Sequence, residues 1–184
     1  MKLEKSNIID IAFELLNEVG LDEFKLRALA VRLSVSATAL YWHFSNKDEL
    51  ISAMANRFYS QAYNKLLMGD SSKQCLLTLG SEFKAALNGF RDGARLCAIA
   101  KPIESDSQEN SKKISAPLVA QGLDQETALS YEAVIISFVL GWSIYNQNKP
   151  VHAHLDEMFN FDQSFEIGLK AIIQGLSLAE GTNN

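Results

Sequence analysis

Apolar residues recur at helical spacing along most of the chain. From Leu26 to Leu33 they fall at every third or fourth position, on one face of a short helix. The same spacing predicts longer helices over residues 6–19, 46–67, 73–90, 124–146 and 162–179, and a short one over 94–100. The sequence holds only three prolines and no run of alternating β-branched residues. The pattern therefore predicts an all-α chain.

Polar residues at the edges of these segments predict helix ends. Ser6 is expected to cap the first helix, and Gly20 to stop it. Ser45 followed by Asp48 resembles a capping box, which predicts a new helix directly after Ser45. Asp124 is a good N-cap for the long helix that follows it.

Three segments predict departures from regular exposed helices. The polar stretch from Glu104 to Ser115 is expected to form a helix broken or kinked near Ala116, because Pro117 follows. Residues 148–160, with His152 and His154, are predicted to form a loop. The helix over 124–146 is apolar almost all round and should be buried.

The stretch from Leu26 to Lys47 carries the most specific pattern. Ser34, Val35 and Ser36 interrupt the helical period with small polar residues that favour a turn. A second short helix follows, with Leu40 as its inward anchor and Phe44 closing its end. Tyr41, Trp42 and His43 are consecutive and cannot all face one core. The pattern predicts a helix-turn-helix, although an ordinary helical hairpin with a solvated face would share its spacing.

Charge favours the same interpretation. The chain has a net charge of -5, yet residues 24–47 hold four cations, Lys25, Arg27, Arg32 and Lys47, and no acid. The excess of acid lies downstream, because residues 1–47 contain six basic and six acidic side chains. A local basic stripe on an acidic chain lets one end of the molecule approach phosphates.

Other classes of function find little support in the sequence. There is no glycine-rich phosphate loop, nucleophile elbow or metalloprotease motif, so an enzyme is not expected. Cys75 and Cys97 lack metal-ligand spacing and indicate free thiols in a reducing compartment. The two histidines at 152 and 154 are expected to be solvated, so neither a metal nor a cofactor is predicted. The most apolar stretch, Ala133 to Trp142, is too short to span a membrane, which favours a cytoplasmic protein.

The motif LxxLAxxLxVSxxxLYWHFxNKxEL, within residues 8–50, resembles the DNA-binding domain of the TetR family of bacterial transcriptional regulators. The resemblance implies a DNA-binding domain over residues 1–47 and a helical-bundle domain for ligand binding and dimerisation over residues 48–184. Two departures stand out: Ser34 occupies a turn position where the family often has glycine, and Thr38 and Ala39 stand where proline and threonine are common.

The second short helix is expected to enter the major groove of double-stranded operator DNA. Small residues at its start allow close approach, and Arg27 is long enough to reach a guanine edge. Tyr41, His43 and Lys47 are expected to hold phosphates. The full set of predicted DNA contacts is Arg27, Ser36, Ala37, Thr38, Tyr41, Trp42, His43 and Lys47.

The segments FRDGARLCAIAKP and GLDQETALSYEAVIISFVLGW resemble the ligand-binding domain of the tetracycline repressors, which bind their drug as a magnesium chelate. The resemblance puts Cys97 and Ser137 where those proteins have magnesium-binding histidines. By the same resemblance, Tyr63 occupies the position of a drug-contacting histidine and Tyr145 that of a glutamate. Phe83 occupies a position that is phenylalanine in those proteins as well. The scaffold is similar, but the metal-binding side chains are not.

An apolar pocket for a small, mainly apolar effector other than magnesium-tetracycline is therefore predicted. Its expected lining is Tyr63, Phe83, Cys97, Ser137, Phe138, Trp142 and Tyr145. The alternative is that these side chains only pack the core.

Together these features predict a ligand-responsive regulator, most simply a repressor, that binds a palindromic operator as a homodimer. The helices over 124–146 and 162–179 are expected to pair with their copies in a four-helix bundle, with Leu169 and Ile173 on the outward stripe. An effector is expected to swing the helix over 45–67 as a lever. The alternative function is a helical dimerisation module without inducer response.

Overall fold

The computed structural model describes residues 3–66, 71–101 and 107–180, without the side chains of 107, 108 and 177–180. These residues form ten helices and no strand, as the sequence pattern predicts. The helices are α1 (Lys5–Glu23), α2 (Leu26–Arg32), α3 (Ala37–Tyr41), α4 (Lys47–Tyr63), α5 (Ser72–Asn88), α6 (Gly93–Ile99), α7 (Ser107–Val119), α8 (Gln125–Gln147), α9 (Lys149–Asp156) and α10 (Phe161–Glu180).

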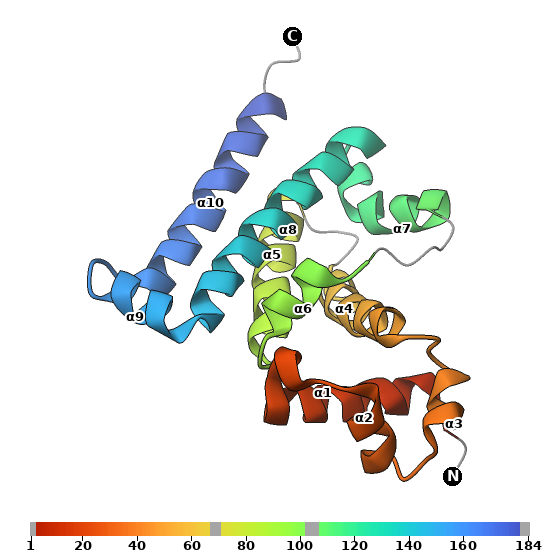
Figure 1. Cartoon of the computed structure of the whole chain (residues 1–184). Helices are drawn as coiled ribbons and strands as arrows, with labels where there is room; N and C mark the ends of the chain where they lie inside the picture. The colour runs from red at the N-terminus through yellow and green to blue at the C-terminus, as the bar shows by residue number, and fades with distance from the viewer. Residues whose placement is uncertain (1–2, 67–70, 102–106, 181–184) are drawn as a thin grey trace.

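Helices α1 to α3 lie together at one end of the molecule, below α4 and α6 in Figure 1. This N-terminal end, residues 3–46, is called the head below. Its core is the inward stripe of α1 packed on α2 and α3, with Leu29, Leu40 and Phe44 all at most 1% exposed. Leu40 and Phe44 therefore have the inward positions that the sequence predicts.

The first helix begins one residue before the predicted cap. The Glu4 carbonyl accepts from the Ile8 amide at 3.1 Å, so Ser6 already lies within the first turn and does not cap it. Gly20 does interrupt the helix, as predicted: its φ of 76° lies in the left-handed region, where glycine has no steric cost.

The start of α4 is capped one residue later than predicted. Asn46, not Ser45, is the N-cap, and its side-chain oxygen accepts from the Glu49 amide at 2.8 Å. The Glu49 carboxylate in turn accepts from the Ser45 amide at 2.7 Å. Glu49 thus takes the place expected for Asp48, but it reaches back to the residue before the N-cap, one position beyond the standard capping box.

The body of the molecule is built around α5 and α8, with α4, α6, α7 and α10 around them (Figure 1). Its core includes Leu79, Phe83, Ile135, Val139 and Phe165, each at most 1% exposed. Asp124 caps α8 as predicted and accepts from the Thr127 amide at 3.0 Å.

Two predicted irregularities are absent from the described residues. Helix α7 runs through Pro117 to Val119 instead of breaking near Ala116, because a proline in the last turn removes only one of the final hydrogen bonds. The predicted loop over 148–160 contains α9. Asn148 caps that helix by accepting from the Val151 amide at 3.4 Å, and Pro150 lies in its first turn, where its missing N–H has no cost.

The C-terminal helices correct a further prediction. Leu169 and Ile173 on α10 are fully buried inside the protomer and do not form an outward stripe. A side-chain carbon added at Gly80 of α5 would lie 2.8 Å from Leu169, which shows how closely α10 approaches α5. Ile167, two positions before Leu169, is instead 61% exposed.

The composition of α8 predicted a helix that is buried on all sides, and this prediction is wrong. Val134, Ile144 and Tyr145 on it are 36–54% exposed. Its length and hydropathy would also suit a membrane span, but a soluble core helix passes the same test and α8 packs directly on α5, α6, α7 and α10. Large apolar side chains on both α8 and α10 thus remain uncovered in the single protomer.

Candidate nucleic-acid interface and internal cavity

The connection between α2 and α3 is a helix C-cap in which Ser34 occupies the left-handed position. The φ of Ser34 is 56°. The Val35 amide donates to the Ala30 carbonyl, and the Ser34 amide to the Val31 carbonyl, each at 3.0 Å. These two bonds form a Schellman motif, whose left-handed position usually holds glycine. The turn is therefore formed without the glycine that is common in the resembling family.

Helix α3 presents its side chains to solvent on all but one face. Ser36 caps it by accepting from the Ala39 amide at 3.1 Å, as predicted. Ser36, Ala37 and Thr38 are exposed at its start. At its end Tyr41 is 49% and Trp42 86% exposed, whereas His43 is half-buried. An uncovered pair of polar-tipped aromatic side chains on a surface is typical of a binding site.

The cations of the head differ in their availability for a partner. Arg32 is held between Glu14 and Glu18 of α1, and Lys25 pairs with Glu23 at 3.2 Å. Arg27 is exposed at the start of α2 and forms no ion pair with any described residue. Of the four cations between residues 24 and 47, Arg27 is thus the one best placed to reach a ligand.

Lys47 has a structural contact that the sequence did not indicate. Its ammonium donates to the Phe24 carbonyl at 2.7 Å and lies 5.6 Å from the centre of the Phe24 ring. The side chain is half-buried. Lys47 therefore ties the first residue of α4 to the α1–α2 connection, and only its remaining N–H donors are available to a phosphate.

A cavity of about 430 Å³, partly open to solvent, lies between α4, α7 and α8. This volume falls in the range of small-molecule sites. Apolar and aromatic side chains alternate around it with amide, hydroxyl and charged groups. The lining residues are Asn56, Tyr59, Ser60, Tyr63, Asn64, Leu66, Asn110, Lys113, Ile114, Pro117, Leu129, Glu132, Ala133 and Ile136.

A buried acid lies in the wall of this cavity. Glu132 is 2% exposed, and its Oε2 accepts from the Tyr63 hydroxyl at 3.4 Å. Burial raises the pKa of the Glu132 carboxyl to about 7, and the Tyr63 hydrogen bond opposes that rise. Burial, followed by the nearby Glu132 charge, raises the pKa of Tyr63, so its hydroxyl stays protonated and acts as the donor.

Only Tyr63 among the seven predicted ligand-binding residues lines this cavity. Phe83 is fully buried behind it, with its ring stacked on Tyr59 at a centroid distance of 4.9 Å. Cys97 is also buried, and burial raises the pKa of its thiol to about 12. Phe83 and Cys97 therefore support the cavity wall through Tyr59 and do not face the cavity itself.

The predicted residues on α8 lie on other faces of that helix. Phe138 and Trp142 pack toward α9 and α10: Trp142 stacks on Phe161 at 4.6 Å, and Phe138 stacks on Phe165 at 5.4 Å. Ser137 and Tyr145 are exposed. Helical spacing turns these four positions away from Glu132 and Ile136, so they do not line this cavity.

Sequence reasoning missed most of the cavity, above all Glu132. A signal was present, since Glu132 is the one acid in α8 beyond its first turn and lies within an otherwise apolar run. The asparagines at 56, 64 and 110 carry no such signal, because exposed asparagines are common on helices. Their shared position depends on how α4 and α7 cross α8.

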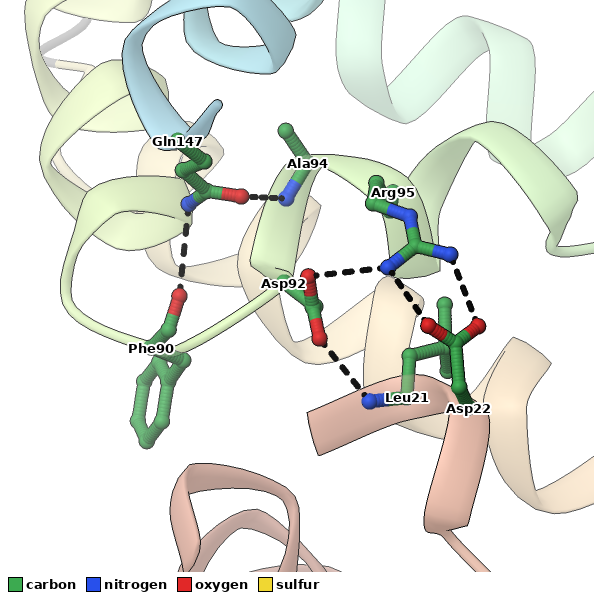
Figure 2. A network of polar contacts seen from close by, with 7 residues as sticks. All are labelled: Leu21, Asp22, Phe90, Asp92, Ala94, Arg95 and Gln147. Atoms are coloured by element: carbon green, nitrogen blue, oxygen red, sulfur yellow. Dashed lines mark hydrogen bonds and ion pairs between the residues drawn. The ribbon is translucent and has the colours of Figure 1, made fainter. Parts of the chain in front are cut away.

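A polar network joins the body to the head (Figure 2). The Gln147 side chain, at the end of α8, donates to the Leu87 carbonyl at 2.7 Å and accepts from the Ala94 amide at 3.0 Å. It thereby holds both sides of the α5–α6 turn. In that turn Asp92, with a φ of 58°, accepts from the Leu21 amide of α1 at 2.9 Å.

An ion pair strengthens this junction. Arg95 of α6 donates to Asp22 of α1 at 2.8 Å and to Asp92 at 3.2 Å (Figure 2). Its guanidinium lowers the pKa of the Asp22 carboxyl through hydrogen bonding and charge. On the other side of α6, the Lys101 amide donates to the Ser52 hydroxyl of α4 at 3.1 Å. Helix α6 therefore contacts both helices that position the head.

Comparisons with known proteins agree with this architecture. Residues 8–54 match the family model described as bacterial regulatory proteins, tetR family. The chain is 30% identical to the tetracycline repressor protein class G of Vibrio anguillarum, with 95% of this chain and 93% of that protein covered.

Solved structures give the same result over the full length. TetR from Acinetobacter baumannii AYE has a TM-score of 0.81 and 30% identity, covering 97% of this chain and 98% of that chain. Its Q116A variant in complex with minocycline has a TM-score of 0.81 and 32% identity, covering 98% of this chain and all of that one. The likeness therefore extends through both the head and the body.

Proposed function

This chain belongs to the TetR family of bacterial transcriptional regulators, and on that premise we propose that it binds a palindromic operator as a homodimer and releases it when a small molecule fills the cavity. The observation that carries the proposal is the continuity of α4. Its N-terminus holds the head through Lys47, and its C-terminal half supplies Tyr59 and Tyr63 to the cavity wall.

The head supplies the DNA-binding surface in this proposal. Helix α3 enters the major groove with Ser36, Ala37 and Thr38 against the bases, and Tyr41, Trp42 and His43 lie toward the backbone. Arg27 extends from α2 to a guanine edge, because its guanidinium is exposed and unpaired among the described residues. Lys47 adds a phosphate contact with the donors that Phe24 leaves free.

Dimerisation uses the uncovered faces of α8 and α10. Ile144 and Tyr145 on α8 and Ile167 on α10 are large apolar side chains exposed in the single protomer. A second copy of the same face covers them in a two-fold four-helix bundle. Leu169 and Ile173 support this face from within the protomer.

The effector has an apolar body and polar anchors. Tyr59, Tyr63 and Ile136 offer apolar surface, while Glu132 and the asparagines offer hydrogen bonds. Binding between α4 and α8 favours one spacing of these helices. The shift in DNA affinity equals the difference between the effector's affinities for the two spacings. Movement of α4 reaches the head directly. Asp92 and Lys101, which flank α6, contact Leu21 and Ser52 and limit the direction of that movement.

The DNA contacts are tested with Arg27→Ala and Lys47→Ala. A duplex selected from a randomised pool by the wild-type protein serves as operator. Arg27→Ala is expected to relax discrimination at one base pair by about 1–3 kcal/mol, because a bidentate guanine contact is lost. Lys47→Ala is expected to weaken binding to all sequences and to lower the slope of log affinity against log salt by about 0.9.

The matched control is Lys65→Ala, which removes the same charge from an exposed position just beyond the C-terminal end of α4. It is expected to leave base discrimination and the salt slope as in the wild type. Identical DNA binding by wild type, Arg27→Ala and Lys47→Ala would contradict the proposed surface. Failure of the wild-type protein to bind any duplex would instead favour a dimerisation module without inducer response.

Tetracycline with magnesium is expected not to release the selected duplex. The resemblance assigns magnesium-binding histidines to the positions of Cys97 and Ser137, and a buried thiol and an exposed hydroxyl do not replace them. Titration of tetracycline with and without magnesium, followed by fluorescence anisotropy of the duplex, measures this. Magnesium-dependent release at micromolar drug would contradict the expectation.

A further inference from the structure

The cavity wall contains a carboxyl group whose hydrogen bonding is incomplete. Glu132 Oε1 is buried and has no hydrogen-bond partner among the described residues. Among the same residues, Oε2 accepts only from the Tyr63 hydroxyl, at a distance of 3.4 Å that marks a weak bond. Glu132 also forms no ion pair within the described part of the chain. A group that is 2% exposed and faces a cavity in this state lacks the partner that buried carboxyls normally have.

In neither protonation state do the described residues satisfy all the hydrogen bonds of the Glu132 carboxyl. As a carboxylate, it has several acceptor sites and one weak donor, and burial makes the missing bonds costly. As a neutral acid, it can share a hydrogen bond with Tyr63 through Oε2, but Oε1 still has no partner among the described residues. A ligand atom that donates to Oε1 resolves the problem, and a cationic donor resolves it best because it also compensates the charge.

The other residues of the cavity wall indicate the chemistry of the rest of the ligand, to which the donor group is attached. Tyr59 and Tyr63 on α4 face Ile114 on α7 and Ile136 on α8, which leaves an apolar slot beside the acid. Lys113 also lines the cavity, but its side chain is exposed and its charge is screened by water. The uncompensated charge at depth is therefore that of Glu132.

We propose that the cavity binds an organic amine: a protonated ammonium group on an aromatic or apolar body, with the ammonium donating to Glu132 Oε1. The Tyr63 hydroxyl donates to the other carboxylate oxygen, and the body lies between the two tyrosines and the apolar residues of α7 and α8. This ligand class rests on the proposed function for its effect on DNA, but its binding is independent of that function.

Matched amine and alcohol pairs test the proposal by isothermal titration calorimetry on the DNA-free, full-length protein. The probes are tryptamine with tryptophol, 2-(2-naphthyl)ethylamine with 2-(2-naphthyl)ethanol, and 4-phenylbenzylamine with 4-phenylbenzyl alcohol. The wild-type protein is expected to bind at least one amine ~10-fold or more tightly than its alcohol, as befits a charge-assisted hydrogen bond.

Two variants assign the preference to its residue. Glu132→Gln is nearly isosteric and is expected to reduce the amine preference to less than about threefold, because the charge is lost. Glu126→Gln, an exposed acid on the first turn of the same helix, is expected to keep the wild-type preference. Equal affinities within every pair, no amine binding at millimolar concentration, or a preference that survives in Glu132→Gln would each overturn the proposal. If Glu132→Gln does not fold, the difference between amine and alcohol affinities for the wild-type protein still tests the proposed ligand class.

Release of the selected duplex separates this inference from the proposed function. A Glu132-dependent amine preference without DNA release supports the ligand class and counts against induction through the cavity. DNA release by amine and alcohol at equal concentrations supports induction and overturns the ligand class.

Discussion

Ile167→Asp is expected to convert the protein from dimer to monomer and to lower its affinity for a palindromic duplex by about 100-fold or more. Ile167 is 61% exposed on α10, one of the two helices proposed to form the dimer interface. In the proposed two-fold bundle the aspartate would place an unpaired charge in an apolar interface, which is costly. Loss of the dimer removes the gain of binding two half-sites at once, which is about 10²–10⁴-fold. Sedimentation at micromolar concentration and anisotropy of the labelled duplex measure the two effects.

Ile99→Asp is the matched control, because Ile99 is 57% exposed but lies on α6, outside that proposed interface. It is expected to remain dimeric and to bind DNA. A dimeric Ile167→Asp protein would contradict the interface. Leu169→Asp cannot serve in this experiment, because it would place a charge in the protomer core and unfold the chain.

Gly93→Ala is expected to destabilise the protein by at least ~3 kcal/mol, the upper part of the range for overpacking a core. A side-chain carbon at Gly93 would lie 2.3 Å from the Leu87 carbonyl oxygen, a distance that real structures do not show. The obstructing atom is backbone, and Gln147 also holds it by a hydrogen bond. The α5–α6 turn must therefore move, which also strains the Asp92 contact to α1. Chemical denaturation at fixed protein concentration measures the loss of free energy of unfolding. Thermal denaturation is expected to show a Tm lower by ~6–12 °C.

Gly89→Ala is the control four residues earlier. Its added carbon would meet the nearest backbone oxygen at 3.4 Å, an ordinary contact, and its φ is -67°. It is expected to leave stability unchanged or slightly raised, since alanine restricts the unfolded chain. Equal stability of the two variants would show that the turn relaxes more easily than its hydrogen bonds indicate.

The sequence by itself determined the helices and the head. Helical spacing of apolar residues and local caps such as Ser36 and Asp124 depend on residues three or four positions apart, so they can be read directly from the chain. The head is also locally specified, because Leu40 and Phe44 can only pack on the helices that immediately precede them. Errors at this level were small: the cap of α4 lies at Asn46 instead of Ser45, and α9 lies where a loop was predicted.

Only the tertiary structure decided which faces of α8 and α10 meet which neighbours. Phe138, Trp142 and Tyr145 share an apolar character with Ile136, which lines the cavity, and composition does not distinguish them. The crossing of α4, α7 and α8 turns Glu132 and Ile136 to the cavity, while α10 covers Phe138 and Trp142. Likewise, Leu169 is buried and Ile167 exposed because α10 approaches α5 at Gly80. An apolar pattern predicts that one face of a helix is buried. Which helix packs on that face depends on contacts between residues far apart in the chain.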